Sequence, residues 1–280
     1  MRLRWFIAAY AALMLGVFPA YAKDKPEWRS WPLGERVGVN VGAFFANLDT
    51  TVRIDATNGV FGTAISFERD LGLDDTKTTL AAGAHWRFLK RSRLDFTYFE
   101  LNRSGASSTS VNIRVGDNVF QANLPLQAFL DIQAFSVGYS YSILFDEKKE
   151  LALGLALSFQ ELTVGFQGTV AGRPLEVSVT EDVLAPLPTV TGRFSYAFTP
   201  KWIFKLAVGY FFIETDFGNT RLDGEILGVN TSIDWQVSKH FNVGLGYNLF
   251  DVDAATEKEV RTTDINYQYD GPILFMGTRF

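Results

Sequence analysis

Large apolar residues alternate with small or polar residues in many segments of the chain after residue 35. In residues 241–249 every odd position is Phe, Val, Leu or Tyr, and every even position is Gly or Asn. Successive side chains of a β-strand point to opposite faces, so this segment predicts a strand with one apolar face. We expect ten such strands. They span residues 36–47, 78–88, 93–102, 133–145, 150–160, 189–198, 202–213, 227–237, 241–250 and 271–280.

The composition of the two faces indicates which face of each strand lies outside the barrel. In a soluble barrel the large residues would fill the interior, whereas here the opposite faces would make only a thin core of Gly, Ala, Ser and polar residues. Each strand is near the roughly 9 to 11 residues that a tilted strand needs to cross the hydrocarbon of a membrane. The pattern therefore predicts an all-β fold, a closed antiparallel transmembrane β-barrel of ten strands, with eight or twelve strands as alternatives.

The connections between the expected strands alternate in length. Bacterial barrels have short periplasmic turns and longer extracellular loops, so both termini are expected in the periplasm. In the first long connection, Asn58-Gly59 favours a hairpin that extends above the membrane. The short connections are residues 89–92, 146–149, 199–201 and 238–240, and the long ones are residues 48–77, 103–132, 161–188, 214–226 and 251–270.

Aromatic residues gather beside the short turns, on the faces expected to meet lipid. Amphipathic rings prefer the headgroup level of a membrane, so these residues predict a periplasmic girdle. The competing interpretation places them in the core of a soluble β-sandwich. The girdle comprises Trp86, Trp202, Trp235 and Phe241, together with Phe88, Phe145, Phe198, Phe204 and Phe280.

The N-terminal residues have the layout of a secretory signal. A basic start and an apolar run that ends at Phe18 precede Ala20-Tyr21-Ala22, which fits an A-x-A cleavage site. The alternative, an uncleaved membrane anchor, would need a longer apolar run. We expect a signal peptide at residues 1–22, a short periplasmic segment at 23–35 and the barrel at 36–280, located in the outer membrane.

The composition argues against several other classes of protein. The chain has no Cys, which excludes disulfides and a lipid-modified lipoprotein. Residues 1–22 carry two of the 26 Lys and Arg and none of the 31 Asp and Glu, so the rest carries a net charge of −7. An acidic chain without a basic stripe is a poor nucleic-acid binder. After residue 22 no stretch of 18 apolar residues is free of charge, which argues against transmembrane helices.

The last residues, YDGPILFMGTRF, run from Tyr269 to Phe280. This ending resembles the C-terminal strand of Gram-negative outer-membrane β-barrel proteins, whose last residue is typically Phe. The resemblance implies that Phe280 is an assembly signal read by the barrel assembly machinery. Thr278 departs from the aromatic or large apolar residue often seen two positions before the end.

A second resemblance concerns Leu71-Gly72-Leu73-Asp74-Asp75, Trp86-Arg87-Phe88, Arg93-Leu94-Asp95-Phe96 and Phe99. These segments resemble a proteobacterial group of outer-membrane barrels that has no assigned activity. The resemblance implies a location and an assembly route, and it implies no particular chemistry.

Charged residues occur on the inward faces, mostly near the short turns. Charges there are costly when unpaired, so we expect a salt-bridged plug in the lumen. The alternative is a selectivity ring, cationic on balance, that favours anions. The predicted network comprises His85, Arg87, Asp95, Arg193, Lys205, Asp234 and Arg279, with Arg93 beside them.

His85 is the natural candidate for a general base, but it lies close to a periplasmic turn. Lipid-modifying barrels, by family analogy, act at the outer leaflet, so we expect His85 to be a hydrogen-bonded structural residue.

Motifs for other chemistry are absent from the sequence: there is no phosphate loop, zinc spacing or G-x-S-x-G. We predict no catalytic, cofactor or metal site, and not an enzyme. Acidic groups in the loops are expected to be solvated, although carboxylates facing lipopolysaccharide could share divalent cations. These groups are Asp74, Asp75, Asp251, Asp253, Glu257 and Glu259.

The expected function is a structural, binding or narrow-pore barrel that contacts outer-membrane lipid and lipopolysaccharide. The alternative is an outer-membrane lipid-modifying enzyme, an acyltransferase or a hydrolase.

Overall fold

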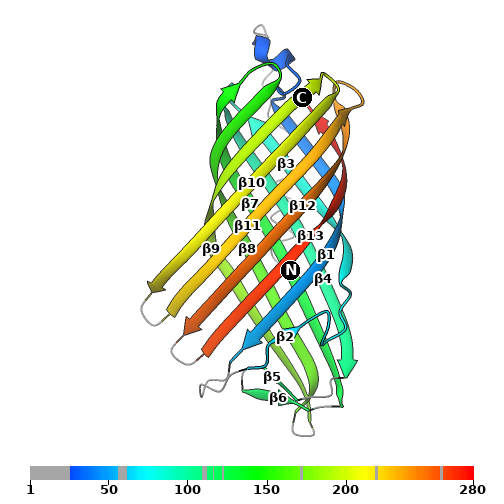
Figure 1. The fold of residues 1–280 in the computed structure, drawn as a ribbon, viewed down its shortest axis with the longest axis vertical. Helices are drawn as coiled ribbons and strands as arrows, with labels where there is room; N and C mark the ends of the chain where they lie inside the picture. Colours follow the sequence, from blue (N-terminus) through cyan, green and yellow to red (C-terminus); the bar gives the residue numbers. More distant parts are fainter. Residues whose placement is uncertain are drawn as a thin grey trace, which may run out of the picture.

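The computed structural model describes residues 26–55, 62–108, 112–115, 117–121, 123–170, 173–217, 220–258 and 261–280. Within these ranges, ten long antiparallel strands follow one another around a closed barrel (Figure 1). They are β1 (Val37–Ile54), β3 (Thr76–Arg87), β4 (Ser92–Ser108), β7 (Pro125–Phe145), β8 (Lys149–Val170), β9 (Arg173–Thr199), β10 (Trp202–Phe217), β11 (Thr220–Gln236), β12 (Phe241–Lys258) and β13 (Arg261–Arg279).

Pairing of the last strand with the first closes the barrel. β1 and β13 pair from Gly38 opposite Arg279 to Ile54 opposite Thr263. At the end of this seam, the backbone N–H groups of Arg36 and Val37 both donate to the Phe280 carbonyl, at 2.7 and 3.1 Å. Closure leaves none of the ten described long strands with a free edge, which is the condition for a sheet to cross a membrane.

The ten predicted strands are confirmed, and the short turns lie where the sequence places them. In Figure 1 these turns lie at the top, which we call the short-turn end, and the opposite end is the long-hairpin end. The prediction of long loops at residues 161–188, 214–226 and 251–270 is wrong. Most of these residues continue the strands β8 to β13 as hairpins.

The reason for this error is that the apolar pattern changes sides within a strand. On β12, Leu245 points outward and is 61% exposed, whereas Val252 points inward and is 5% exposed. Beyond Leu249 the outward positions are Asp251 and Asp253. The strand therefore continues, but above the lipid its apolar side chains face the interior. The end of the outward apolar face is the end of the lipid contact and not of the strand.

Because of a β-bulge in β7, the prediction for one girdle residue, Phe145, is wrong. The pairing of β7 with β8 shifts between Ser142 and Leu144, and both Ile143 and Leu144 are exposed. A bulge adds one residue to a strand and reverses the facing of those that follow. Phe145 consequently points into the barrel and is 5% exposed, so it does not belong to the outward girdle.

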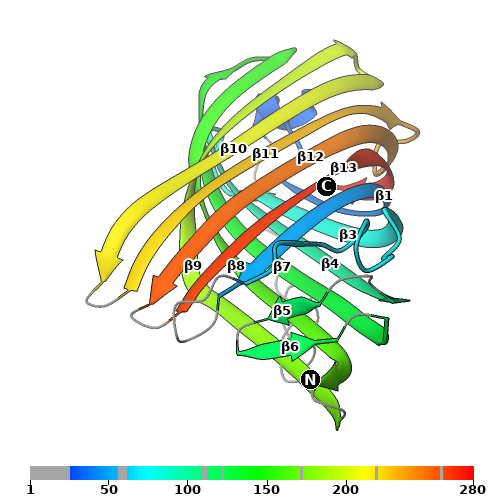
Figure 2. The ribbon, with the colours of Figure 1, turned by 60° about the horizontal axis from the view of Figure 1, so that its bottom comes forward.

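The interior is filled at the long-hairpin end by an apolar cluster. The connection after β1 returns as β2 (Ile65–Ser66), which pairs with Thr51 and Val52 as part of a hairpin. The predicted turn Asn58-Gly59 lies outside the described residues. Residues from β2 to Leu73 and from the small hairpin of β5 (Ile113–Val115) and β6 (Asn118–Phe120) join this cluster (Figure 2). The apolar plug, as we call it, includes Phe67, Leu71, Leu73, Leu101, Phe120, Leu130 and Phe166.

The N-terminal segment fills the short-turn end. It contains the short 3-10 helix η1 (Glu27–Ser30), and its Leu33 is buried against Phe145, Ala197 and Ile203. Trp28 and Trp31 pack against this cluster. Residues 26–35 thus lie in the mouth of the barrel, and the predicted signal peptide lies outside the described residues. No helix in the described part of the chain is long and apolar enough to cross a membrane.

The orientation of the barrel can be tested by cysteine labelling, since the chain has no Cys of its own. Asp74→Cys and Asp253→Cys, both exposed at the long-hairpin end, should react with a membrane-impermeant thiol reagent on intact cells. Lys148→Cys and Lys239→Cys, both exposed in short turns, should react only after the outer membrane is opened. Labelling of Lys148→Cys on intact cells, with no labelling of Asp74→Cys, would show the opposite orientation.

Candidate functional site

The most deeply buried ion pair in the lumen joins β3 to β8. Arg87 Nη2 donates to both carboxylate oxygens of Glu150, at 2.8 and 2.9 Å, and the two side chains are 1% and 2% exposed. Ser142 donates to the same carboxylate. The Arg87 guanidinium also lies 4.5 Å from the ring centre of Phe145, the residue that the bulge turns inward. A charge at this depth is stable only when its partners are in place.

Arg193 connects this pair to β4. Its Nη2 lies 3.1 Å from Glu150, and its Nη1 donates to Asp95 at 3.0 Å and to Ser140 at 3.2 Å. Asp95 also receives a hydrogen bond from Arg93 Nε at 2.8 Å. Charges from β3, β4, β8 and β9 are therefore joined into one continuous network across the barrel.

The remaining predicted charges lie on the β10–β13 side. Lys205 Nζ donates to Asp234 at 2.8 Å, and Asp234 also receives a hydrogen bond from Ser232. Arg279 lies 3.7 Å from Glu35 of the N-terminal segment. Burial acts to raise the pKa of Glu35, but Lys205, Arg279 and Arg93 act against it, and the net direction is downward. Glu35 is therefore ionised at neutral pH.

His85 occupies a tight site beside β1. Its Nε2 is buried with no hydrogen-bond partner among the described residues, and it lies 3.8 Å from Glu35 Oε1. A Cβ atom on Gly38 would come within 2.3 Å of the imidazole ring, so the ring needs a glycine opposite. The ring therefore packs in the wall next to the network and makes a contact with Glu35 that is longer than a hydrogen bond.

The structure thus brings the predicted lumen residues together in one layer, which we call the ion layer. Glu35 and Glu150 belong to it and were not predicted. Glu150 has the inward parity of Ala152 and Gly154, so the alternation of its strand could have revealed it. Glu35 precedes the first strand, and no signal in the sequence pointed to it. The ion layer comprises Glu35, His85, Arg87, Arg93, Asp95, Glu150, Arg193, Lys205, Asp234 and Arg279.

The aromatic residues predicted beside the short turns face outward, apart from Phe145. Trp86, Trp202, Trp235 and Phe241 are all more than a third exposed. Trp202 and Trp235 stack on neighbouring strands, with ring centres 6.1 Å apart. Phe280 is 69% exposed at the seam between the first and last strands.

A second buried ion pair holds the apolar plug. Arg103 on β4 donates to Glu68 at 2.6 Å and also to the Thr50 hydroxyl of β1. Glu68 in turn accepts the backbone N–H of Thr50 at 3.0 Å. The two charged side chains are 2% and 10% exposed. Glu68, which lies between Phe67 and Leu71 of the plug, is therefore tied to the barrel wall.

Between the ion layer and the apolar plug lies a chamber of about 550 Å³. Small residues such as Gly83, Gly138 and Gly209 leave this space open. Ser136 and Ser158 are hydrogen-bonded to each other at 2.8 Å on its wall. The wall combines apolar side chains, such as Ile273 and Phe275, with neutral hydroxyl and amide groups, which include Asn40, Thr97, Thr191 and Asn230.

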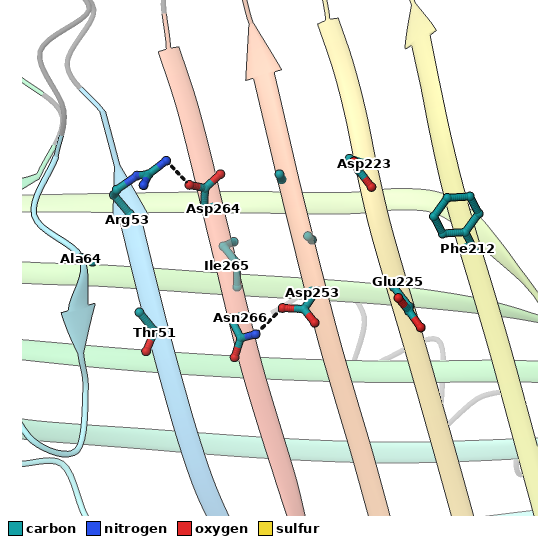
Figure 3. Close-up of a pocket in the computed structure, with 12 residues that line it drawn as sticks. Thr51, Arg53, Ala64, Phe212, Asp223, Glu225, Asp253, Asp264, Ile265 and Asn266 are labelled. Atoms are coloured by element: carbon teal, nitrogen blue, oxygen red, sulfur yellow. Dashed lines mark hydrogen bonds and ion pairs between the residues drawn. The ribbon is translucent and has the colours of Figure 1, made fainter.

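The outer surface of the long-hairpin end carries a shallow hollow of about 370 Å³. Figure 3 shows Asp223 and Glu225 on β11, Asp253 on β12 and Asp264 on β13 around it. Asp264 is paired with Arg53, and Asp253 accepts a hydrogen bond from Asn266. Asp251 and Asp253 thus lie on a strand and not in a loop. Among the described residues, no group of three or more potential ligands could hold a metal ion.

Comparison with known proteins supports the fold. No family model matches the chain, and no curated protein matches it in sequence. Among solved structures, the outer-membrane protease OmpT of Escherichia coli has a TM-score of 0.53 and 10% identity, over 88% of this chain and 97% of that chain. Ail, the attachment invasion locus protein of Yersinia pestis, has a TM-score of 0.32 and 8% identity, over 88% of this chain and 99% of that chain.

The transport unit of the autotransporter AIDA-I from Escherichia coli has a TM-score of 0.37 and 10% identity, over 98% of each chain. Of these three, only OmpT is similar enough in structure to support the fold. The fold shared with OmpT, together with the apolar outer surface, identifies the chain as an outer-membrane β-barrel.

Replacement of Arg193 tests the ion layer. Arg193→Ala removes two ion pairs and leaves the buried Glu150 with one cation fewer, so the free energy of unfolding should fall by about 3 kcal/mol. Urea unfolding of the refolded barrel measures this change. Arg91→Ala, in an exposed turn, is the matched control and should leave the midpoint unchanged. Equal midpoints for Arg193→Ala and the wild type would show that the ion layer does not stabilise the barrel.

Proposed function

We propose that the protein is a sealed outer-membrane barrel that serves as a binding module and not as an open pore. The observation that carries this proposal is the apolar plug, in which Phe67, Leu71 and Phe166 are 0% exposed inside the long-hairpin end. Water and ions do not cross an apolar filling of this kind. The Arg103–Glu68 pair supports the same conclusion because it fixes the plug to the wall.

The ion layer supports a plug rather than a selectivity ring. A selectivity ring presents charges to passing ions. In this layer, Arg87 and Glu150 satisfy each other and are almost fully buried, and Arg193 is shared between two carboxylates. These paired charges stabilise the barrel from within.

The alternative, an acyltransferase or hydrolase, has less support. The chain has two histidines, His85 and His240, and both lie at the short-turn end. A general base for lipid at the outer leaflet would have to lie at the other end. Proteolysis is the activity of OmpT, whose likeness to this chain extends to the fold. That the protein is not an enzyme stays a prediction.

Three partners belong to the same proposal. The exposed apolar residues of the wall would contact lipid, and the acidic outer surface at the long-hairpin end would face lipopolysaccharide. The exposed ring of Phe280 would be read by the assembly machinery while the β1–β13 seam is still open.

Planar-bilayer recording tests the sealed lumen. The refolded wild type should show no steady conductance. Glu68→Ala leaves the buried Arg103 without its carboxylate, which should loosen the plug and produce brief openings. Glu147→Ala, in an exposed turn, is the control and should stay silent. A wild-type channel that remains open would overturn the proposal.

A further inference from the structure

Aromatic rings line the end of the chamber that adjoins the apolar plug. We call this end the ceiling, and the opposite end, at the ion layer, the floor. Tyr269 of β13 lies between Phe99 of β4 and Phe250 of β12, with ring centres 5.0 and 4.9 Å apart and planes within 20° of each other. All three residues line the chamber, and Phe44 packs edge-on against Phe99 and Tyr269. The chamber therefore ends at a stack of aromatic rings, which an aromatic ligand can contact.

The floor of the chamber is the ion layer, and the layer has an excess of positive charge. Among the described residues it contains five bases, Arg87, Arg93, Arg193, Lys205 and Arg279, and four acids, Glu35, Asp95, Glu150 and Asp234. The bases therefore outnumber the acids by one. Each base lies 2.6 to 3.7 Å from a carboxylate, and Asp95 and Glu150 are each shared by two bases. The layer therefore attracts a further anion more than a further cation.

The cations that border the chamber are not equally accessible. The side chain of Lys205 is 30% exposed, whereas those of Arg93 and Arg193 are 14% and 13% exposed. All three line the chamber. Lys205 is therefore the most exposed of these three cations and the one that an incoming anion contacts most readily.

The distance between floor and ceiling sets the length of a ligand. Asp95 and Phe99 lie four residues apart on β4. With about 3.3 Å per residue and a strand tilt of about 40°, the two levels are about 10 Å apart along the barrel axis. The volume of about 550 Å³ falls within the range of ordinary ligand pockets, roughly 300 to 1,000 Å³.

We propose that this chamber binds a small aromatic carboxylate, with its carboxylate at Lys205 and its ring beneath Tyr269. The carboxylate is attracted to Lys205, the most exposed base of the layer, and the ring contacts the aromatic ceiling. The neutral hydroxyl and amide groups of the wall leave room for water around the middle of the ligand. A cationic ligand is repelled by the floor, and a long acyl chain is stopped by the apolar plug. The inference rests on the proposed binding role of a sealed barrel.

The apolar part of the seal is smaller at the short-turn end than at the long-hairpin end. At the short-turn end the N-terminal segment contributes a single fully buried side chain, Leu33, with Trp28 and Trp31 only partly buried. At the other end the apolar plug contains more than twenty buried side chains and the Arg103–Glu68 pair. Movement of the short N-terminal segment costs less than movement of the plug.

The experiment is isothermal titration calorimetry of the refolded mature chain in neutral detergent micelles, with 3-phenylpropionate as the probe. One site per barrel is expected. The neutral isostere 3-phenylpropionamide and the ringless propionate should each bind at least about tenfold more weakly, because each lacks one of the two contacts. A detergent blank corrects for partition into micelles.

Two variants and their controls locate the site. Gly228→Leu fills the chamber, where a Cβ atom would meet Phe250 at an ordinary contact distance of 3.5 Å, and should reduce binding at least about tenfold. Val190→Leu, on the lipid-facing side of β9, should bind as the wild type does. Lys205→Gln should weaken 3-phenylpropionate and leave the amide unaffected, whereas Lys201→Gln, in a turn, should change neither.

Three results would overturn the inference: no heat above the detergent blank, equal affinity for the carboxylate and the amide, or equal affinity of Gly228→Leu and the wild type. A barrel that conducts would overturn the proposed sealed lumen and would not by itself decide ligand binding. A silent barrel that binds none of the probes would overturn this inference alone.

Discussion

Every peptide group that crosses the hydrocarbon of a membrane needs a hydrogen-bond partner within the protein, because lipid offers none. The chain meets this requirement by pairing each of its ten described long strands with two neighbours and by closing β13 onto β1. Closure has a second consequence. The wall encloses an interior that has to be filled, and the inward side chains of the same strands must fill it.

The filling changes with depth. Near the short turns it is ionic, with Arg87, Glu150 and Arg193 in mutual contact. In the middle it is small and neutral, which leaves the chamber. At the long-hairpin end it is apolar, because there the strands have left the lipid and bury their large residues inward as a soluble protein does. Three kinds of interior thus lie within one wall, and each follows from what surrounds the barrel at that level and from which side chains the strands direct inward.

The sequence predicted the parts of this structure that depend on local alternation. The ten strands, the short turns and the inward parity of Arg87, Asp95, Arg193 and Lys205 all follow from a period of two. Alternation could not reveal the partners of these charges. The register between β8 and β9 and the packing across the lumen to β4 decide that Arg193 meets both Glu150 and Asp95. Alternation also could not reveal the β-bulge that turns Phe145 inward, since a bulge is a property of pairing between two strands.

The apolar plug could not be predicted from the sequence. Leu71 and Leu73 fall in a segment that reads as a loop, and nothing local shows that the loop folds into the barrel. The ends of the strands at the long-hairpin end could not be predicted either. Where the lipid ends, the apolar side chains of a strand shift from its outward face to its inward face. A polar outward face beyond Leu249 has the pattern of a strand end, although it marks the end of the membrane.

The central claim is that both ends of the lumen are closed while the chamber between them is open. Thr97 of β4 lines the chamber, and its side chain is exposed to that open space. The most direct measurement is reaction of Thr97→Cys with a polyethylene-glycol maleimide too large to pass either seal, scored by gel shift. We expect no modification of the folded barrel and full modification after unfolding, whereas Asp74→Cys, on the outer surface, reacts in both states. Modification of Thr97→Cys in the folded barrel at the rate of Asp74→Cys would contradict the closed lumen.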